Sequence, residues 1–177
     1  MNKIIAVIGM CGSGKSEAVK YFEKNGYKKV YFGGVVLDEM KRLGLVINEQ
    51  NERKTRENLR KEFGMGAMAV KSINKIEEYY RSGNVVIESL YSWEEFKIIK
   101  KKYGDAFKLL AVYTTKALRY ERLSKREFRP MNTEQAISRD YAELEKLDKG
   151  GPIAFADYTV INDRTLVELN KQLEKYI

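Results

Sequence analysis

The chain has 177 residues, no His, one Cys and a net charge of +8, from 33 Lys and Arg against 25 Asp and Glu. The length predicts one domain that buries roughly 70% of its unfolded surface, and the charge favours anionic partners such as nucleotides or nucleic acids. The composition excludes His-based acid–base catalysis, His metal ligands and an internal disulfide, and no apolar run reaches the ~20 residues that cross a bilayer, so we expect a cytoplasmic protein without a membrane partner.

Strands and helices are predicted to alternate along the chain. The apolar run 4–8 is typical of a buried parallel strand and not of a signal peptide, and the segment 16–26 after it has helical spacing that ends at Gly26. The later strands are predicted at 27–32, 84–89, 106–114 and 157–162, and the later helices at 35–44, two within 48–83, 92–104, 116–128, 133–147 and 166–177. This order predicts an α/β fold, with a five-stranded parallel sheet covered by helices on both faces and ligands at the carboxyl ends of the strands.

A glycine-rich turn between the first strand and the first helix matches the phosphate-loop pattern G-x-x-x-x-G-K-[ST]. Glycines let successive backbone N–H groups point into one concavity, which binds phosphate. We expect ATP and Mg²⁺ as cofactors, with Lys15 neutralising the β- and γ-phosphates and the Ser16 hydroxyl coordinating the metal. Cys11 fits a tolerated small residue better than a redox site. The candidate ATP-binding residues of the loop are Gly9, Cys11, Gly12, Ser13, Gly14, Lys15 and Ser16.

Arginines recur at helical spacing in two places. Arg119, Arg122 and Arg126 share one predicted helical face, with Arg129 just before Pro130. The second series consists of Arg53, Arg56 and Arg60, and a further arginine, Arg139, lies on a later helix. Two such clusters suit two phosphorylated ligands, because phosphoryl transfer spreads negative charge over donor and acceptor. The alternative is a solvated face that pairs with glutamates of the same helices.

The chain resembles the nucleoside monophosphate kinase group of P-loop proteins, in the branch that contains dephospho-coenzyme A kinase and archaeal adenylate-kinase-related proteins. The resemblance is carried by the stretches GMCGSGKSEAVKYFEKNGY, NLRKEFGMGAMA, NVVIESLYSWEEFKIIKKKYGD, LRYERLSKRE and ADYTVIND, in that order. It implies a single kinase domain over 1–177, with an acceptor-binding region at about 34–80 and a lid at about 120–140.

The resemblance also implies roles for the candidate residues. Arg119 and Arg122 would lie at the donor nucleotide, Arg126 and Arg139 would supply lid charges, and Asn162 would lie near the adenine. The acceptor phosphate would be held by Arg53, Arg56 and Arg60, and the catalytic residues would be Lys15, Arg119, Arg122 and Arg126.

Two acidic residues are candidates on the metal and acceptor side. Glu88 ends the apolar run NVVIES, where a Walker B-like acid would bind Mg²⁺ through water and border the acceptor; the alternative is a surface glutamate at a strand end. Asp38 is a weaker candidate, because a pairing with Lys41 or Arg42 would explain it equally well.

The acceptor remains open at this stage. Dephospho-coenzyme A kinases carry Asp-x-Asp after the second strand, whereas this chain reads VYFGGVVLDEM there, with no acid before Asp38. A phosphate acceptor needs no base, so the missing acid favours a nucleoside monophosphate. Dephospho-coenzyme A kinase stays an alternative, and the tract KIIKKKYG supports a second one, a nucleic-acid-binding P-loop protein or polynucleotide kinase. A nucleotide sensor that closes without turnover is the third.

Overall fold

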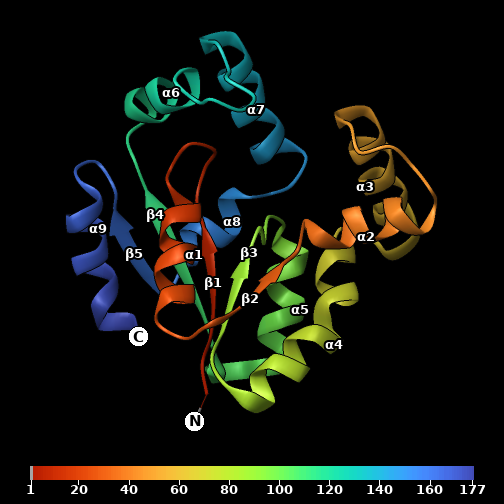
Figure 1. The fold of residues 1–177 in the computed structure, drawn as a ribbon, viewed down its shortest axis with the longest axis horizontal. Coiled ribbons are helices and arrows are strands. Elements are labelled where there is room, and N and C mark those ends of the chain that lie inside the picture. Colours follow the sequence, from red (N-terminus) through yellow and green to blue (C-terminus); the bar gives the residue numbers. More distant parts are fainter. Residues whose placement is uncertain (1) are drawn as a thin grey trace.

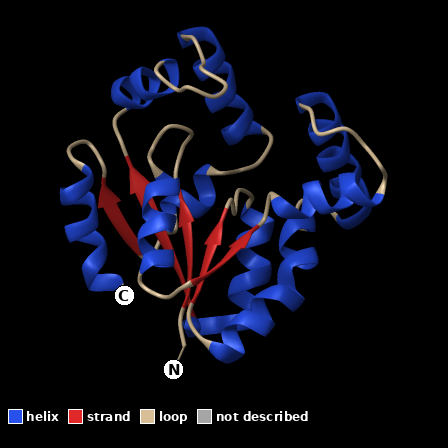
Figure 2. Ribbon diagram, in the orientation of Figure 1, coloured by secondary structure: helices blue, strands red, loops and turns tan. Residues whose placement is uncertain are grey.

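In the computed structural model, which describes residues 2–177, five strands form one parallel sheet in the order β2-β3-β1-β4-β5 (Figures 1 and 2). The strands are β1 Ile4–Ile8, β2 Lys28–Tyr31, β3 Val85–Glu88, β4 Phe107–Tyr113 and β5 Tyr158–Ile161. The five predicted strands and their parallel arrangement are therefore confirmed. Because β1 lies in the centre, the turn that follows it opens at the point where the strand order reverses, which is where open α/β sheets bind ligands.

The helices cover both faces of this sheet. Their bounds are α1 Lys15–Lys24, α2 Gly34–Arg42, α3 Glu49–Phe63, α4 Ala67–Ser82, α5 Trp93–Tyr103, α6 Lys116–Ser124, α7 Thr133–Glu145, α8 Gly150–Ala154 and α9 Leu166–Leu173. The predicted helices are confirmed, although α6 ends four residues earlier than its pattern predicted. The short helix α8 was not predicted.

The core consists of two apolar layers, one on each side of the sheet. Successive side chains of a strand point to opposite faces, so Ile4, Ala6 and Ile8 pack towards one layer while Ile5 and Val7 pack towards the other. Further members of the first layer are Phe32, Met40, Ile76, Ile87 and Ile99, and those of the second are Ala18, Val19, Phe22, Leu169 and Leu173. Both faces of β1 are buried, which explains its uninterrupted apolar run.

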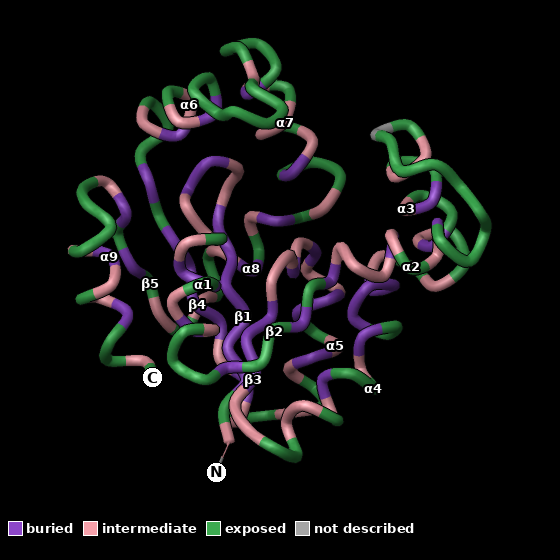
Figure 3. The backbone as a smooth tube through the Cα atoms, in the orientation of Figure 1, coloured by how far each residue is buried: buried purple, intermediate pink, exposed green. Residues whose placement is uncertain are grey.

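Two helical arms rise beyond the carboxyl ends of the strands. Figure 1 shows α6 and α7 above the end of β4, and α3 at the far side of the molecule beyond α2. Their outward surfaces are exposed in Figure 3, whereas the strands below them are buried. Side-chain caps fix where the arms begin: Asn48 accepts the backbone N–H of Asn51 ahead of α3, and Asn132 and Gln135 form a capping box for α7.

Candidate active site

The phosphate-loop sequence forms a tight turn from the end of β1 to the start of α1. Gly9, Gly12 and Gly14 adopt φ values of 150°, 83° and 90°, a region that side chains with a Cβ rarely adopt. A Cβ added at Gly12 would lie 2.8 Å from the backbone oxygen of Arg119. The loop backbone therefore requires glycine both for its conformation and for the close approach of α6.

Lys15 and Ser16 lie at the first turn of α1. The Lys15 ammonium donates to the Met10 carbonyl at 2.9 Å, so its side chain curls back over the loop. Burial and the nearby ammonium of Lys149 lower the pKa of Lys15 to about 7. The Ser16 hydroxyl donates to a carboxylate oxygen of Glu88 at 3.4 Å. Glu88 reaches this point because β3 pairs with β1, opposite Val7.

These two oxygens provide a test of whether Mg²⁺ fits the site. Within residues 2–177, no group of three or more His, Cys, Asp or Glu side chains could hold a metal by itself. A hydroxyl and one carboxylate are nevertheless the kind of ligands that Mg²⁺ takes beside nucleotide phosphates and water. Ser16 and Glu88 therefore fit a nucleotide-dependent metal site.

Residues behind the loop hold its backbone in place. The buried Asn162 side chain donates to the Ser13 carbonyl at 2.9 Å, and Arg122 donates to the Asn162 carbonyl at 2.8 Å. The Thr114 hydroxyl lies within hydrogen-bond distance of both of these carbonyls. In this structure Asn162 and Arg122 support the loop from the ends of β5 and α6.

Arg119 joins the loop to the helical arm above it. Its guanidinium donates to the Cys11 carbonyl at 2.9 Å. It also forms a bidentate ion pair with Asp140 of α7, with hydrogen bonds of 2.9 and 2.7 Å. Such bidentate pairs fix orientation as well as charge. Tyr120 also donates to Asp140, at 3.1 Å. Asp140 was not a candidate from the sequence, because a single acid within a helix is typical of a solvated face.

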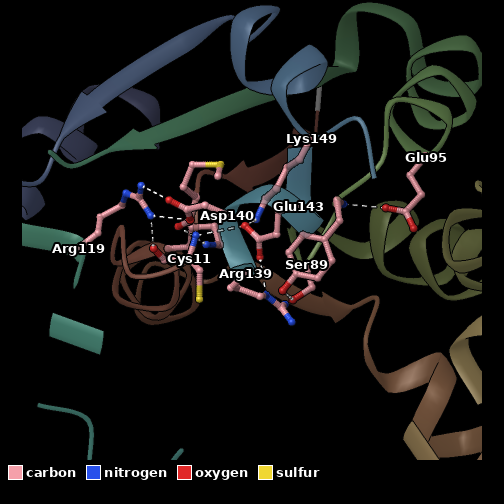
Figure 4. A network of polar contacts seen from close by, with 11 residues as sticks. Cys11, Ser89, Glu95, Arg119, Arg139, Asp140, Glu143 and Lys149 are labelled. Atoms are coloured by element: carbon pink, nitrogen blue, oxygen red, sulfur yellow. Dashed lines mark hydrogen bonds and ion pairs between the residues drawn. The ribbon is translucent and has the colours of Figure 1, made fainter. Parts of the chain in front are cut away.

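A second charged cluster lies directly against the loop. Glu143 of α7 accepts the backbone N–H of Cys11 at 3.2 Å, the ammonium of Lys149 at 2.7 Å and the Nε of Arg139 at 3.1 Å (Figure 4). The Glu143 and Lys149 side chains are only 3% and 0% exposed. Neither residue was a candidate from the sequence, where DYAELEKLDKG predicts an exposed helix end. Of the predicted lid arginines, the structure brings Arg139 to this cluster.

Side chains from both arms meet at the ends of β2 and β3. Arg129, in the loop after α6, donates to Glu52 of α3 at 3.4 Å. Tyr31 lies among charged groups: burial and the carboxylates of Glu88 and Glu52 raise its pKa, while Arg56 and Arg129 oppose the shift. We call this group of neighbouring side chains the Tyr31 cluster; it consists of Tyr31, Glu52, Arg56, Glu88 and Arg129.

The three candidate arginines of α3 differ in where they point. Arg53 is exposed and pairs with Glu57 at 3.0 Å, so the structure does not bring it to the Tyr31 cluster. Arg56 and Arg60 are half-buried, and the Nε of Arg60 has no hydrogen-bond partner within the described residues. Asp38 is exposed on α2.

Buried Glu95 lies near Arg60, at the start of α5. One oxygen accepts the backbone N–H groups of Tyr91 and Ser92 at 2.7 and 3.1 Å, while the other has no partner within residues 2–177. Burial raises the pKa of Glu95 from 4.5 to about 7, against the opposing effect of those two bonds and of Arg60.

This shift predicts a pH-dependent stability. Because folding raises the pKa of Glu95, its contribution to stability is fully present below pH 4.5 and is lost as the pH rises to about 7. At pH 8 we expect the free energy of unfolding of Glu95→Gln to exceed that of the parent by about 3 kcal/mol, so the variant is more stable there. At pH 4.5 we expect the two free energies to differ little. Urea denaturation at both pH values measures this, with the exposed Glu78→Gln as control. The same difference in unfolding free energy between Glu95→Gln and the parent at both pH values would contradict the raised pKa of Glu95.

The lysine tract of α5 lies apart from the phosphate loop. A helix that follows a parallel strand runs back towards the end of the sheet where the strands begin (Figure 1). These lysines therefore lie at the amino ends of the strands. Lys97, Lys100 and Lys102 pair with acidic neighbours at the surface. A solvated face therefore explains the tract. The described residues also include no helix that is long and apolar enough to cross a membrane.

The parallel sheet, the phosphate loop and the two arms define the class of protein: a P-loop protein with a kinase fold. A shikimate kinase from Acinetobacter baumannii in complex with shikimate has a TM-score of 0.63 at 15% identity, over 99% of this chain and 91% of that one. A gluconokinase from Sinorhizobium meliloti has a TM-score of 0.57 at 16% identity, over 97% and 89%. Both comparisons show the fold.

Sequence comparison identifies the family within this class. The profile of a family described as "AAA domain" matches residues 5–146. A UPF0200 protein from the archaeon Thermococcus onnurineus is 36% identical over 178 residues, which cover 98% of this chain and 96% of the relative. The chain belongs to this AAA-domain family and to the UPF0200 proteins.

Proposed function

We propose that this protein is an ATP-dependent nucleotide kinase that transfers a phosphate to a nucleoside monophosphate. One observation carries the proposal: cationic side chains of two separate arms lie at the carboxyl ends of the strands, where the phosphate loop lies. Arg119 of α6 donates to the Cys11 carbonyl of the loop at 2.9 Å, and Arg56 of α3 lies near enough to Tyr31, at the end of β2, to oppose the rise in the pKa of Tyr31. An enzyme that joins two phosphorylated ligands needs positive charge on both sides of the transferred group.

The donor side follows from the loop. Its backbone N–H groups and Lys15 would bind the β- and γ-phosphates of ATP, and Ser16 with Glu88 would hold Mg²⁺. The metal supplies charge neutralisation and orientation of the phosphates. Arg126, which is exposed in this structure, would reach the transferred phosphate when the lid closes, and closure would exclude water from the reaction.

The acceptor side supports a phosphate and not a bare hydroxyl. Arg56 and Arg60 would bind an acceptor phosphate, which is already ionised at neutral pH and attacks without a general base. Glu88 is an acid in the Tyr31 cluster, and it favours the alternative of a hydroxyl acceptor such as dephospho-coenzyme A. The two alternatives predict activity with different acceptors, so an assay of each acceptor distinguishes them.

The deciding experiment is a coupled ADP-release assay with Mg·ATP. The acceptors are AMP, CMP, UMP, GMP, their deoxy forms, dephospho-coenzyme A and a short RNA with a 5′-hydroxyl. ADP release that depends on one nucleoside monophosphate supports the proposal and names the acceptor. Release with dephospho-coenzyme A alone, or with RNA alone, would replace the proposal by that alternative. ATP binding without turnover on any acceptor would favour the nucleotide sensor.

The acceptor assignment makes its own prediction. We expect Arg56→Ala to raise the KM of the acceptor about tenfold or more and to leave the KM of ATP within about twofold, because a charged hydrogen bond to one ligand is lost. Steady-state kinetics with each substrate varied in turn measures this. Lys54→Ala removes an exposed charge from the same helix and serves as control. Equal rises in both KM values would refute the assignment of Arg56 to the acceptor.

A further inference from the structure

The buried ion pair beside the phosphate loop is not explained by the loop motif or by the two arms. Lys149 has no exposed surface, and the ring of Tyr91 lies 4.5 Å from its ammonium. Its position depends on a sharp turn, because Asp148 adopts a φ of 48° and the N–H of Lys149 donates to the Glu143 carbonyl at 3.2 Å. Removing two charges from water is unfavourable, so a buried pair is weak evidence of a purely stabilising role.

The partners of the Glu143 carboxylate indicate what the pair does. Its three donors are a phosphate-loop N–H at Cys11, the ammonium of Lys149 and the guanidinium of Arg139. A loop amide, a lysine and an arginine form the donor set that proteins use for phosphate groups. Burial opposes ionisation, yet Lys149 and then Lys15 hold the pKa of Glu143 below its usual value. The Glu143 carboxylate therefore accepts hydrogen bonds from the kinds of group that bind phosphate.

We infer that Lys149 is a second phosphate-binding lysine of this site, and that Glu143 is a built-in anion that occupies Lys149 and the Cys11 N–H until a phosphate displaces it. This inference rests on the proposed function, because it assumes that the loop binds a nucleotide. The ligand is a phosphate group with at least two negative charges, supplied by the end of the donor triphosphate or by the acceptor.

The location of Glu143 couples this exchange to the lid. Glu143 is one turn after Asp140 on α7, and Asp140 is held by Arg119. When a phosphate replaces Glu143, that one contact between α7 and the loop is lost while the Arg119 pair persists. Arg139, also on α7, is released from Glu143 at the same time and can turn to the phosphate. Ligand entry would thus free both Lys149 and Arg139 in one step.

The test compares nucleotide affinity in two opposite variants. We expect Glu143→Gln to bind one of the phosphate ligands, Mg·ATP for a donor phosphate or AMP for an acceptor phosphate, about tenfold more tightly than the parent, because the competing anion is gone, and Lys149→Met to bind the same ligand at least about tenfold more weakly. Isothermal titration calorimetry with Mg·ATP, Mg·ADP and AMP measures both. Glu145→Gln, an exposed position on the same helix, serves as control and should match the parent.

The three ligands distinguish the two sources of phosphate. If Lys149 binds the terminal donor phosphate, Lys149→Met weakens Mg·ATP far more than Mg·ADP or AMP; if it binds the acceptor phosphate, AMP is weakened most. If Glu143→Gln binds neither Mg·ATP nor AMP more tightly than the parent, the inference is overturned, because a structural role predicts no gain in affinity. The double variant Glu143→Gln/Lys149→Met removes both charges of the buried pair, so neither is left without the other and the test stays valid if a single variant fails to fold. It should bind the affected ligand as weakly as Lys149→Met, and parent-like binding would also overturn the inference.

These outcomes are independent of the acceptor assay. Tighter binding by Glu143→Gln without transfer to any acceptor would support the inference on the pair while the proposed kinase function fails. Transfer to a nucleoside monophosphate with unchanged binding by Glu143→Gln would refute the inference and leave the kinase function standing.

Discussion

Replacing Lys15 with alanine is expected to lower kcat/KM for phosphoryl transfer by about 10³-fold or more, because a preorganised charge at the developing transition state is removed. In the structure the Lys15 ammonium is held 2.9 Å from the Met10 carbonyl, over the loop that would receive the phosphates. The coupled ADP-release assay on the best acceptor measures the loss. Lys20→Ala removes a lysine from the outer face of the same helix, paired there with Glu17, and should leave the rate unchanged.

The same variant should fold and should show a distinct pH dependence of stability. Folding lowers the pKa of Lys15 from 10.5 to about 7, so its contribution to stability is present above pH 10.5 and is lost as the pH falls to 7. The unfolding free energy of the parent should therefore rise between pH 7 and pH 9.5 relative to that of Lys15→Ala. Turnover close to that of the parent would eliminate the assigned role of Lys15, and identical pH curves would contradict its burial in a positive environment.

The second large effect is expected at Arg126. Arg126→Ala should lower kcat by about 10³-fold while the Kd of Mg·ATP changes less than about threefold, because an arginine that enters from a lid stabilises the transition state more than the bound ground state. Single-turnover kinetics measures the chemical step, and calorimetry measures binding. Lys125→Ala, an exposed neighbour paired with Glu121, is the matched control.

Two results would remove Arg126 from this role. A loss of ATP affinity equal to the loss of kcat would make Arg126 an ordinary binding residue. A kcat close to that of the parent would show that another lid charge performs the task, with Arg129 as the next to test because it already reaches α3 through Glu52.

Local signals were strong enough to predict most of the fold. The run Ile4–Ile8 and the glycine turn after it leave few alternatives to a buried strand followed by a helix, and β3 and β4 have similar apolar runs. The edge strands β2 and β5 bury only one residue each and have weaker signals. The short helix Gly150–Ala154 escaped prediction because five residues with two glycines and a proline carry no helical period. The strand order was also beyond reach, since it depends on which apolar faces pair across the whole chain.

The site was less predictable than the fold. The phosphate loop carries its own pattern, so its residues were identified directly. Glu143 and Lys149 were not, because a charged residue near a helix end is normally exposed, and only the fold of α7 and α8 buries them against Cys11. The spacing of the α3 arginines, three and four residues, predicted that they share one face of the helix. Spacing alone does not tell which members of such a face are exposed to solvent, and the structure shows Arg53 exposed.

The central position of β1 has a consequence for how the chain is made. β1 is synthesised before both of its neighbours, β3, with Ile4 opposite Val85, and β4, with Ile4 opposite Phe107. Until β4 has been synthesised, this strand of Ile, Ala and Val presents an unpaired apolar edge, which is prone to aggregate. The nascent chain therefore depends on completion of β4 or on protection of β1, and the loop residues Cys11 and Ser13 gain their contacts with Arg119 and Asn162 later still.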